Sequence, residues 1–347
     1  PVPEIIGSGP FVFDKDAYMP GAKVVYQKNT NYKPRSEPAS YAAGGKVVHV
    51  DRVEWLYIPA PATTMNALIA GEIDFWETPS PDLVPGMEGN PDITIKVIDP
   101  LGTQGWLRPN HLNPPFDNPK ARQALLHMVK QADYLQAIIG DEKFWRTCGA
   151  YFMCDTPLDT DVGAGPLMNQ DLEEASRLLK EGGYNGETLI LMDPTDIPVL
   201  HGASLVTAQM LRKIGAKVEV QAMDWSTLTS RRAETKSIAD GGWNIFHTYS
   251  TGADVASPIA NIGVSGGCVE EAWFGWPCDK TLEALRDQFS RESDPAKQVE
   301  IGVALQNRAY EVVPYVNYGQ WFQPTAYRTS LKGVLISPVP FFWNIEK

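Results

Sequence analysis

The segment 187–249 alternates between strand-like and helix-like stretches, and this alternation constrains the fold more than any other feature of the chain. Each strand-like stretch is short and rich in apolar residues, and each helical stretch separates two of them. Strands that are joined through a helix pair in parallel with a right-handed crossover. We therefore predict an α/β fold whose sheet is mainly parallel and flanked by helices. The strands are expected at 187–192, 216–223 and 243–249, and the helices at 203–214 and 226–236.

The remainder of the chain has a different character on each side of about residue 105. The first part is strand-rich, and the later part contains helices that begin at Asn or Asp caps, such as Asn118 followed by Pro119. A chain of 347 residues is longer than one core usually fills, so two lobes are expected. Early strands are expected at 46–58, 73–76 and 92–99, the early helix at 62–70, the later helices at 119–131, 171–181, 279–290 and 294–312, and a late strand at 313–318.

Charge and composition exclude several classes of protein. The chain has 42 acidic and 30 basic residues and a net charge of -12, whereas a nucleic-acid-binding domain needs a basic surface. An acidic surface is also repelled by anionic lipid. No apolar run approaches the roughly 20 residues that cross a bilayer, so no membrane insertion is expected.

Four cysteines fall into two close pairs, and the pairing points to an oxidising compartment. We predict two local disulfides, Cys148–Cys154 and Cys268–Cys278, each closing a loop. Four buried free thiols remain the alternative. Neither pair has CxxC spacing, and no His lies at zinc-finger spacing, so neither a metal site nor any cofactor is expected.

An ordered series of short motifs then makes the chain resemble a known family, the peptide- and solute-binding proteins of ABC importers, which includes dipeptide, oligopeptide and nickel receptors. Each motif is weak alone, and their order along almost the whole chain carries the resemblance. The motifs are GSGPF at 7–11, NALIAGEIDF at 66–75, Asn110 with PPFDNPKARQA at 114–124, EASRLLKEGGY at 174–184, LRKIGAKV at 211–218 and Trp343–Asn344.

The resemblance implies a two-lobe periplasmic-binding-protein-like fold of type II. Lobe one is then residues 1–103 with 319–347, and lobe two is residues 104–318. The chain is expected to cross between the lobes near 101–106 and 318–320. The turn at 7–11 normally lies well inside such chains, so the resemblance also implies a truncated fragment with an incomplete lobe one that binds ligand weakly.

The candidate ligand contacts lie where strands of lobe two end and where the chain crosses between lobes. In an open α/β sheet, ligands bind beyond the carboxyl ends of the strands. The loop after the strand 243–249 offers hydroxyls, aromatic rings and one carboxylate, which suit a polar solute. The expected ligand-binding residues are His247, Tyr249, Ser250, Thr251 and Asp254 in this loop, with Trp106, Arg108, Gln320 and Trp321 at the crossings.

Each of these residues can also be explained by a role in the fold, without a ligand. The resemblance implies that an Asp in the loop pairs with the amino group of a peptide, and Asp254 is the nearest match, but it also fits a solvated turn. Trp106 and Arg108 suit a ligand with an apolar face and an anionic group. They equally suit a ring packed at the hinge and an arginine paired with a surface carboxylate.

One departure from the family weakens a strict dipeptide assignment. Dipeptide-binding members clamp the ligand carboxylate with a basic residue, and the corresponding loop 193–202 offers only His201. A nickel receptor is less favoured still, because the His residues are scattered. Arg122 and Asp117 belong to a family motif, and we expect them to stabilise the fold.

Two other functions compete with transport. Residues 263–267 fit the nucleophile-elbow pattern GxSxG with Ser265 as the nucleophile, but that pattern needs a strand before it and a helix after it. All five His residues precede Ser265, and a hydrolase of this kind needs one downstream. A secreted carbohydrate-binding module suits the acidic, aromatic-rich chain, although such modules are usually all-β.

The sequence therefore predicts a periplasmic or otherwise extracytoplasmic solute-binding receptor that is not an enzyme. It captures a peptide or another small polar solute between two lobes and delivers it to the membrane permease of an ABC importer. Ligand favours closure of the lobes only through its higher affinity for the closed form. No cofactor is expected, and the receptor is expected to act as a monomer.

Overall fold

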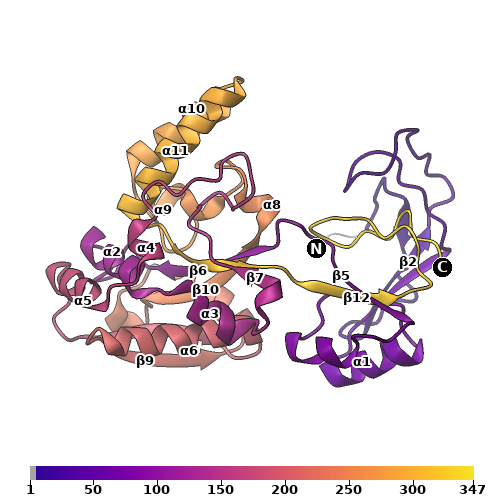
Figure 1. The fold of residues 1–347 in the computed structure, drawn as a ribbon, viewed down its shortest axis with the longest axis horizontal. Helices are drawn as coiled ribbons and strands as arrows, with labels where there is room; N and C mark the ends of the chain where they lie inside the picture. The colour runs from indigo at the N-terminus through magenta and orange to yellow at the C-terminus, as the bar shows by residue number, and fades with distance from the viewer. Residues whose placement is uncertain (1–4) are drawn as a thin grey trace. The chain divides into compact units, whose positions relative to one another are not determined.

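The structure is a computed structural model that describes residues 5–347 and divides into two compact units (Figure 1). Unit 1 holds the described residues up to Pro100 together with Phe322–Lys347, and unit 2 is Leu101–Trp321. Strand β6 (Thr103–Pro109) pairs with β11 (Val316–Trp321) as far as the pair Thr103 and Trp321. This pairing fixes both strand ends in unit 2, so residues 101–103 and 319–321, assigned to lobe one from the sequence, belong to unit 2 here.

Unit 1 contains two three-stranded antiparallel sheets with strand orders β1-β2-β3 and β4-β12-β5. Helix α1 ends at Gly71 in the left-handed conformation, as the sequence predicts. The expected strand 46–58 is much shorter, because the carbonyl of Val47 accepts the N–H of Asn344 instead of joining the sheet. The elements are β1 (Phe11–Phe13), β2 (Lys23–Lys28), β3 (Arg52–Leu56), α1 (Pro61–Ala70), β4 (Phe75–Trp76), η1 (Pro81–Gly86), β5 (Ile93–Val97) and β12 (Pro324–Arg328).

Unit 2 is built on a six-stranded sheet with the order β7-β11-β6-β10-β8-β9. Strand β8 is parallel to both β10 and β9, whereas β10 with β6, β6 with β11 and β11 with β7 are antiparallel. The α/β class is confirmed, but the sheet is mixed and not mainly parallel. The parallel strands β8, β9 and β10 follow one another through helical crossovers, the connection that parallel pairing needs. These strands are β7 (Trp145–Arg146), β8 (Thr188–Pro194), β9 (Lys217–Met223) and β10 (Ile245–Thr251).

Helices α2 and α5 of unit 2 begin where the sequence places their caps. The side chain of Asn118 accepts the N–H of Lys120, and Asp171 accepts those of Glu173 and Glu174. Helix α6 begins five residues before its predicted start, because Pro198 occupies its first turn. The helices are α2 (Pro119–Met128), α3 (Gln131–Ile138), α4 (Gly165–Met168), α5 (Leu172–Glu181), α6 (Pro198–Lys213), α7 (Trp225–Arg231), α8 (Gly252–Val255), α9 (Cys268–Glu271), α10 (Lys280–Arg291) and α11 (Pro295–Val312), with 3-10 turns η2 (Glu142–Phe144), η3 (Ile238–Asp240) and η4 (Ile262–Val264).

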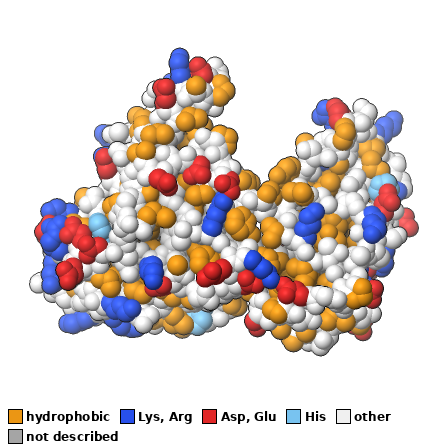
Figure 2. Space-filling model, viewed as in Figure 1, with side chains coloured by type: hydrophobic (Ala, Val, Ile, Leu, Met, Phe, Trp, Pro, Cys, Tyr) orange, Lys and Arg blue, Asp and Glu red, His pale blue; other side chains and the backbone are white. Residues whose placement is uncertain are grey.

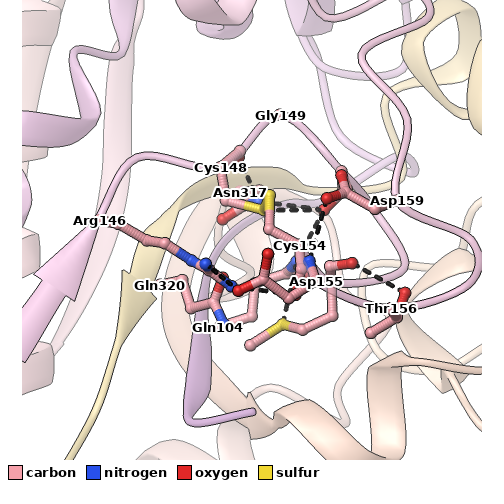
Figure 3. Close-up of a disulfide and its surroundings, with 12 residues drawn as sticks. Gln104, Arg146, Cys148, Gly149, Cys154, Asp155, Thr156, Asp159, Asn317 and Gln320 are labelled. Atoms are coloured by element: carbon pink, nitrogen blue, oxygen red, sulfur yellow. Dashed lines mark hydrogen bonds and ion pairs between the residues drawn. A yellow bond between two sulfur atoms is a disulfide. The ribbon is translucent and has the colours of Figure 1, made fainter. Parts of the chain in front are cut away.

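Both predicted disulfides are present, Cys148–Cys154 and Cys268–Cys278, and each closes a local loop of unit 2. Figure 3 shows the first of them beside strands β7 and β11. Arg122, which the sequence predicts to stabilise the fold, donates to the carbonyls of Phe116, Asp117 and Val312. It therefore binds the loop of Asp117 through the main chain and ties α2 to the end of α11.

The face of the molecule seen in Figure 2 carries both signs of charge in an interspersed pattern, with hydrophobic side chains between them. Within residues 5–347, every helix falls short of the length and apolar character that a bilayer crossing requires.

Candidate functional site

The strand order of unit 2 defines where a ligand would bind. The chain runs from β8 through α6 to β9, and then through α7 to β10 on the other side of β8. Right-handed crossovers to opposite sides of one strand place their helices on opposite faces of the sheet. The carboxyl ends of β8 and β10 therefore form the switch point, at which open α/β sheets bind ligands. Pro194 ends β8 and Thr251 ends β10.

Tyr249 presents an aromatic surface at this edge. Its side chain is 44% exposed, and its ring meets the ring of Trp321 edge-on with 5.8 Å between centroids. Trp321 is itself only 3% exposed and stacks on Tyr318, so a buried ring supports the exposed ring of Tyr249. Partial burial raises the pKa of Tyr249, which keeps its hydroxyl protonated and able to donate a hydrogen bond.

Asp254 presents a carboxylate in the turn that follows β10. Strand β10 runs two residues further than predicted, and Thr251 then caps the short helix α8. The hydroxyl of Thr251 donates to Asp254 Oδ2 at 2.9 Å, and the hydroxyl of Ser250 lies 3.5 Å from the same oxygen. Asp254 is exposed, and no Lys, Arg or His of the described chain forms an ion pair with it. The turn is thus an oriented, uncompensated negative charge.

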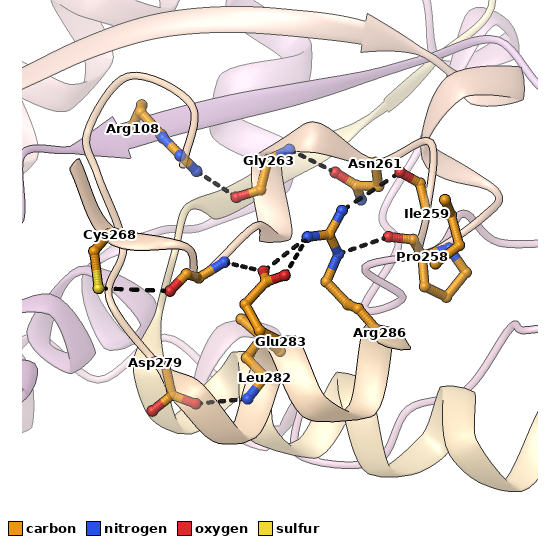
Figure 4. Close-up of polar contacts among 11 residues, drawn as sticks. Arg108, Pro258, Ile259, Asn261, Gly263, Cys268, Asp279, Leu282, Glu283 and Arg286 are labelled. Carbon is orange, nitrogen blue, oxygen red and sulfur yellow. Dashed lines mark hydrogen bonds and ion pairs between the residues drawn. The ribbon is translucent and has the colours of Figure 1, made fainter. Parts of the chain in front are cut away.

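Trp106 and Arg108 are corrections to the sequence prediction, because both lie in the interior of unit 2. The ring of Trp106 stacks on Tyr315, with 4.5 Å between centroids. The guanidinium of Arg108 donates to the carbonyls of Phe274, Gly263, Pro314 and Trp273 at 2.5–3.2 Å (Figure 4 shows the Gly263 contact). Burial lowers its pKa to about 9, and the carbonyls favour the cationic form. Arg108 therefore binds main chain with four of its five donors, and its full burial keeps it from a solute.

His247 is a second correction. Its side chain is buried on the face of β10 that α6 covers, where Nε2 lies 2.8 Å from the hydroxyl of Thr207 and Nδ1 lies 3.3 Å from that of Ser204. Burial lowers its pKa to about 3, so the folded protein holds a neutral imidazole. The residue stabilises the packing of α6 on the sheet and does not reach a ligand.

This burial predicts a pH-dependent loss of stability. The folded-state pKa of His247 lies below the unfolded value of 6.5, so the unfolded chain binds the extra proton as pH falls from 6.5 towards 3. The free energy of unfolding should drop by about 2.5 kcal/mol between pH 7 and 4.5 from this residue. Urea titrations at both pH values should show that His247→Gln removes this part of the loss, whereas the half-exposed control His49→Gln keeps it. An equal pH dependence in wild type and His247→Gln would contradict the assignment.

Gln320 is also engaged within unit 2 (Figure 3). Its amide nitrogen donates to the carbonyl of Leu101 at 2.7 Å, and its oxygen accepts from Arg146 Nε at 2.9 Å. Arg146 in turn forms an ion pair with Asp155 in the loop of the Cys148–Cys154 disulfide. The sequence analysis did not single out Arg146, whose partner across the sheet could not be known before β7 was paired with β11.

The end of β8 and the first turns of α6 contribute a pair of which the sequence indicated only His201. His201 Nδ1 lies 2.9 Å from the carboxylate of Asp193, which is almost fully buried at the end of β8. The side chain of His201 is 39% exposed. The signal that could have revealed Asp193 is its position directly after an apolar strand, where an unpaired carboxylate is costly to bury.

The surroundings of Ser265 do not match a hydrolase. The 3-10 turn η4 precedes Ser265, whereas a nucleophile elbow needs a strand there. The loop is instead held by α10, since Glu283 accepts the N–H of Gly266 and Arg286 donates to the carbonyl of Pro258 (Figure 4). Across the described residues, no three His, Cys, Asp or Glu side chains are grouped to hold a metal ion.

The fold and this strand-end edge define the class of protein. Unit 2 has the α/β architecture of periplasmic binding proteins of type II, with an aromatic ring and an oriented carboxylate at its switch point. A sequence profile described as bacterial extracellular solute-binding proteins, family 5 Middle, matches residues 2–268. The chain therefore belongs to the family 5 extracellular solute-binding proteins.

Individual relatives agree with this membership. The chain is 37% identical over 345 residues to the probable peptide ABC transporter periplasmic-binding protein y4tO of Sinorhizobium fredii, covering 99% of this chain and 65% of that protein. It is 24% identical to di/tripeptide-binding protein 2 of Pseudomonas aeruginosa, covering 96% and 59%. This chain thus spans less than two thirds of the length of these relatives.

Solved structures share the fold. One is the periplasmic binding protein DppA of Helicobacter pylori in complex with the peptide STSA, with a TM-score of 0.77, 21% identity, and coverage of 98% of this chain and 62% of that chain. Another is AgaA of A. tumefacien in complex with agropinic acid, with a TM-score of 0.78, 20% identity, and coverage of 97% and 66%.

Proposed function

We propose that this protein is the extracytoplasmic receptor of an ABC importer and that it captures a short peptide for delivery to a membrane permease. Membership of the solute-binding family supports this role, as do relatives named as peptide-binding proteins. The two disulfides suit a compartment outside the cytoplasm. The receptor binds and releases its ligand without chemical turnover.

The observation that carries the peptide assignment is the turn of Asp254. Its carboxylate is exposed, receives the hydroxyl of Thr251, and has no cation of its own in the described chain. A protonated amine is the group that such a carboxylate recognises best, through charge-assisted hydrogen bonds. The exposed ring of Tyr249, near the carboxyl end of β10, offers a face for the apolar part of the peptide.

Replacing Asp254 should therefore weaken binding of peptides that have a free amino terminus. We expect Asp254→Asn to raise the Kd of di- to tetrapeptides by about 10- to 100-fold, the cost of a lost charge-assisted pair. N-acetylated versions of the same peptides should bind weakly to both proteins. Isothermal titration calorimetry with a peptide series measures both effects.

Asp240→Asn is the matched control. Asp240 is also an exposed carboxylate in a turn of unit 2, and it accepts the hydroxyl of Ser237 at 2.6 Å. Its replacement should leave the Kd unchanged. If Asp254→Asn binds free and N-acetylated peptides as wild type does, the amine is not recognised at this turn, and the peptide assignment loses its support.

A further inference from the structure

Arg232 lies in an unusual surrounding at the end of α7. Its guanidinium carbon lies 4.7–5.7 Å from the centroids of four aromatic rings. Cation–π contacts of this kind hold a guanidinium in a fixed orientation. The four rings belong to Trp225, Phe246, Trp273 and Phe274, and we call them with Arg232 the aromatic arginine site.

The guanidinium of Arg232 lacks any acceptor from the protein. Across residues 5–347, no carboxylate forms an ion pair with it and no oxygen accepts a hydrogen bond from its side chain, and its Nε is buried without a partner. Burial lowers its pKa to about 10, and no charged neighbour opposes that effect. Buried polar groups are almost always paired, so the buried Nε without a partner is an exception. The terminal NH2 groups of this partly exposed side chain have no protein acceptor either, which leaves them available to a ligand.

Arg108 contacts one of the same rings, but its guanidinium has acceptors within the protein. Its guanidinium carbon lies 5.3 Å from the centroid of Trp273, and four main-chain carbonyls take its donors. The two cations therefore share one aromatic ring, but only Arg232 keeps its donors free. Arg232 is also partly exposed, so a solute can reach it.

The aromatic arginine site is separate from the ring of Tyr249. Phe246 and Tyr249 are three residues apart on β10, so their side chains lie on opposite faces of the sheet. Phe246 pairs with Arg108 and lies five residues before Thr251, which is about 17 Å along a strand. The edge at which we place the peptide amine is therefore at the other end of β10.

We propose that the aromatic arginine site binds a small carboxylic acid that has a flat apolar body, of the benzoate class. The planar fork of an arginine matches a carboxylate through two parallel hydrogen bonds. The partly exposed rings of Trp225, Trp273 and Phe274 provide apolar surface for the body of the acid. A single available cation suits a monoanion better than a phosphate dianion, since Arg108 is buried and four of its five donors are already taken.

Sodium benzoate is the probe, and benzamide at matched ionic strength is the neutral control of the same shape. Saturation-transfer NMR and thermal shifts of the whole protein should show benzoate binding with a Kd at least about tenfold lower for wild type than for Arg232→Met. Arg231→Met is the matched variant, because Arg231 is the adjacent arginine and donates to the carbonyls of Gly241 and Gly242. It should bind benzoate as wild type does.

Three results would overturn the proposal: benzoate failing to bind wild type, benzamide binding equally well, or Arg232→Met keeping the wild-type Kd. If Arg232→Met does not fold by circular dichroism, Arg232→Lys decides. It keeps the charge but loses the fork, so it should bind benzoate several-fold more weakly. Wild-type affinity in Arg232→Lys would show that the fork is not used.

Discussion

Replacing Arg108 by methionine is expected to lower the free energy of unfolding by about 3–5 kcal/mol. The methionine fills much of the volume but leaves the carbonyls of Phe274, Gly263, Pro314 and Trp273 without their donor. A buried group that loses its partner costs its full desolvation penalty. The expected readout is a lower midpoint of urea unfolding with an unchanged slope.

Arg212→Met is the control for that experiment. Arg212 is on α6, and its contact with the carbonyl of Val218 at 3.3 Å is exposed to solvent. Removing it should change the free energy of unfolding by less than about 0.5 kcal/mol. If Arg108→Met is equally mild, the four carbonyls find other donors, and Arg108 is not the structural residue described above.

The position of Arg108 also shows why sequence reasoning failed at the crossing strand. Strand β6 is buried on both faces, from Gln104 through Pro109. In such a strand the side chains on both faces of the sheet are buried, so alternation of apolar and polar residues does not separate interior from surface residues. Trp106 and Arg108 therefore carry no sequence signal that distinguishes a packed residue from a ligand contact. For Arg108, only the four carbonyl contacts in the structure make that distinction.

Tyr249 and Asp254 were predictable because their place depends on local order alone. Tyr249 lies near the carboxyl end of a strand in an alternating α/β segment and Asp254 follows that strand, which places both at the edge where open α/β sheets bind ligands. Antiparallel pairing of β6 with β10 could not be foreseen, since it joins segments about 140 residues apart and no turn connects them. The aromatic arginine site was missed for the same reason, because its rings come from α7, β10 and the loop of the second disulfide.

A single methyl group at Gly105 should also lower the stability of the protein strongly. A Cβ built on Gly105 would lie 2.0 Å from Cε2 of Tyr318, which is closer than real contacts allow. The ring of Tyr318 stacks on Tyr134 and Trp321, so it has little room to move. We expect Gly105→Ala to lower the free energy of unfolding by about 3 kcal/mol, the upper part of the range for overpacking.

The same substitution links the core to the binding edge. Gly105 pairs with Tyr249 across the strands, and a displaced Tyr318 would push Trp321 against the ring of Tyr249. Gly105→Ala should therefore also raise the Kd for peptides, whereas Gly165→Ala, whose Cβ meets no atom within 4 Å, should change neither quantity. Adding Tyr318→Leu to Gly105→Ala should recover part of the lost stability, since the shorter side chain relieves the contact. If the double variant is no more stable than the sum of the two single effects, the methyl group is accommodated elsewhere, and Tyr318 does not couple the core to the edge.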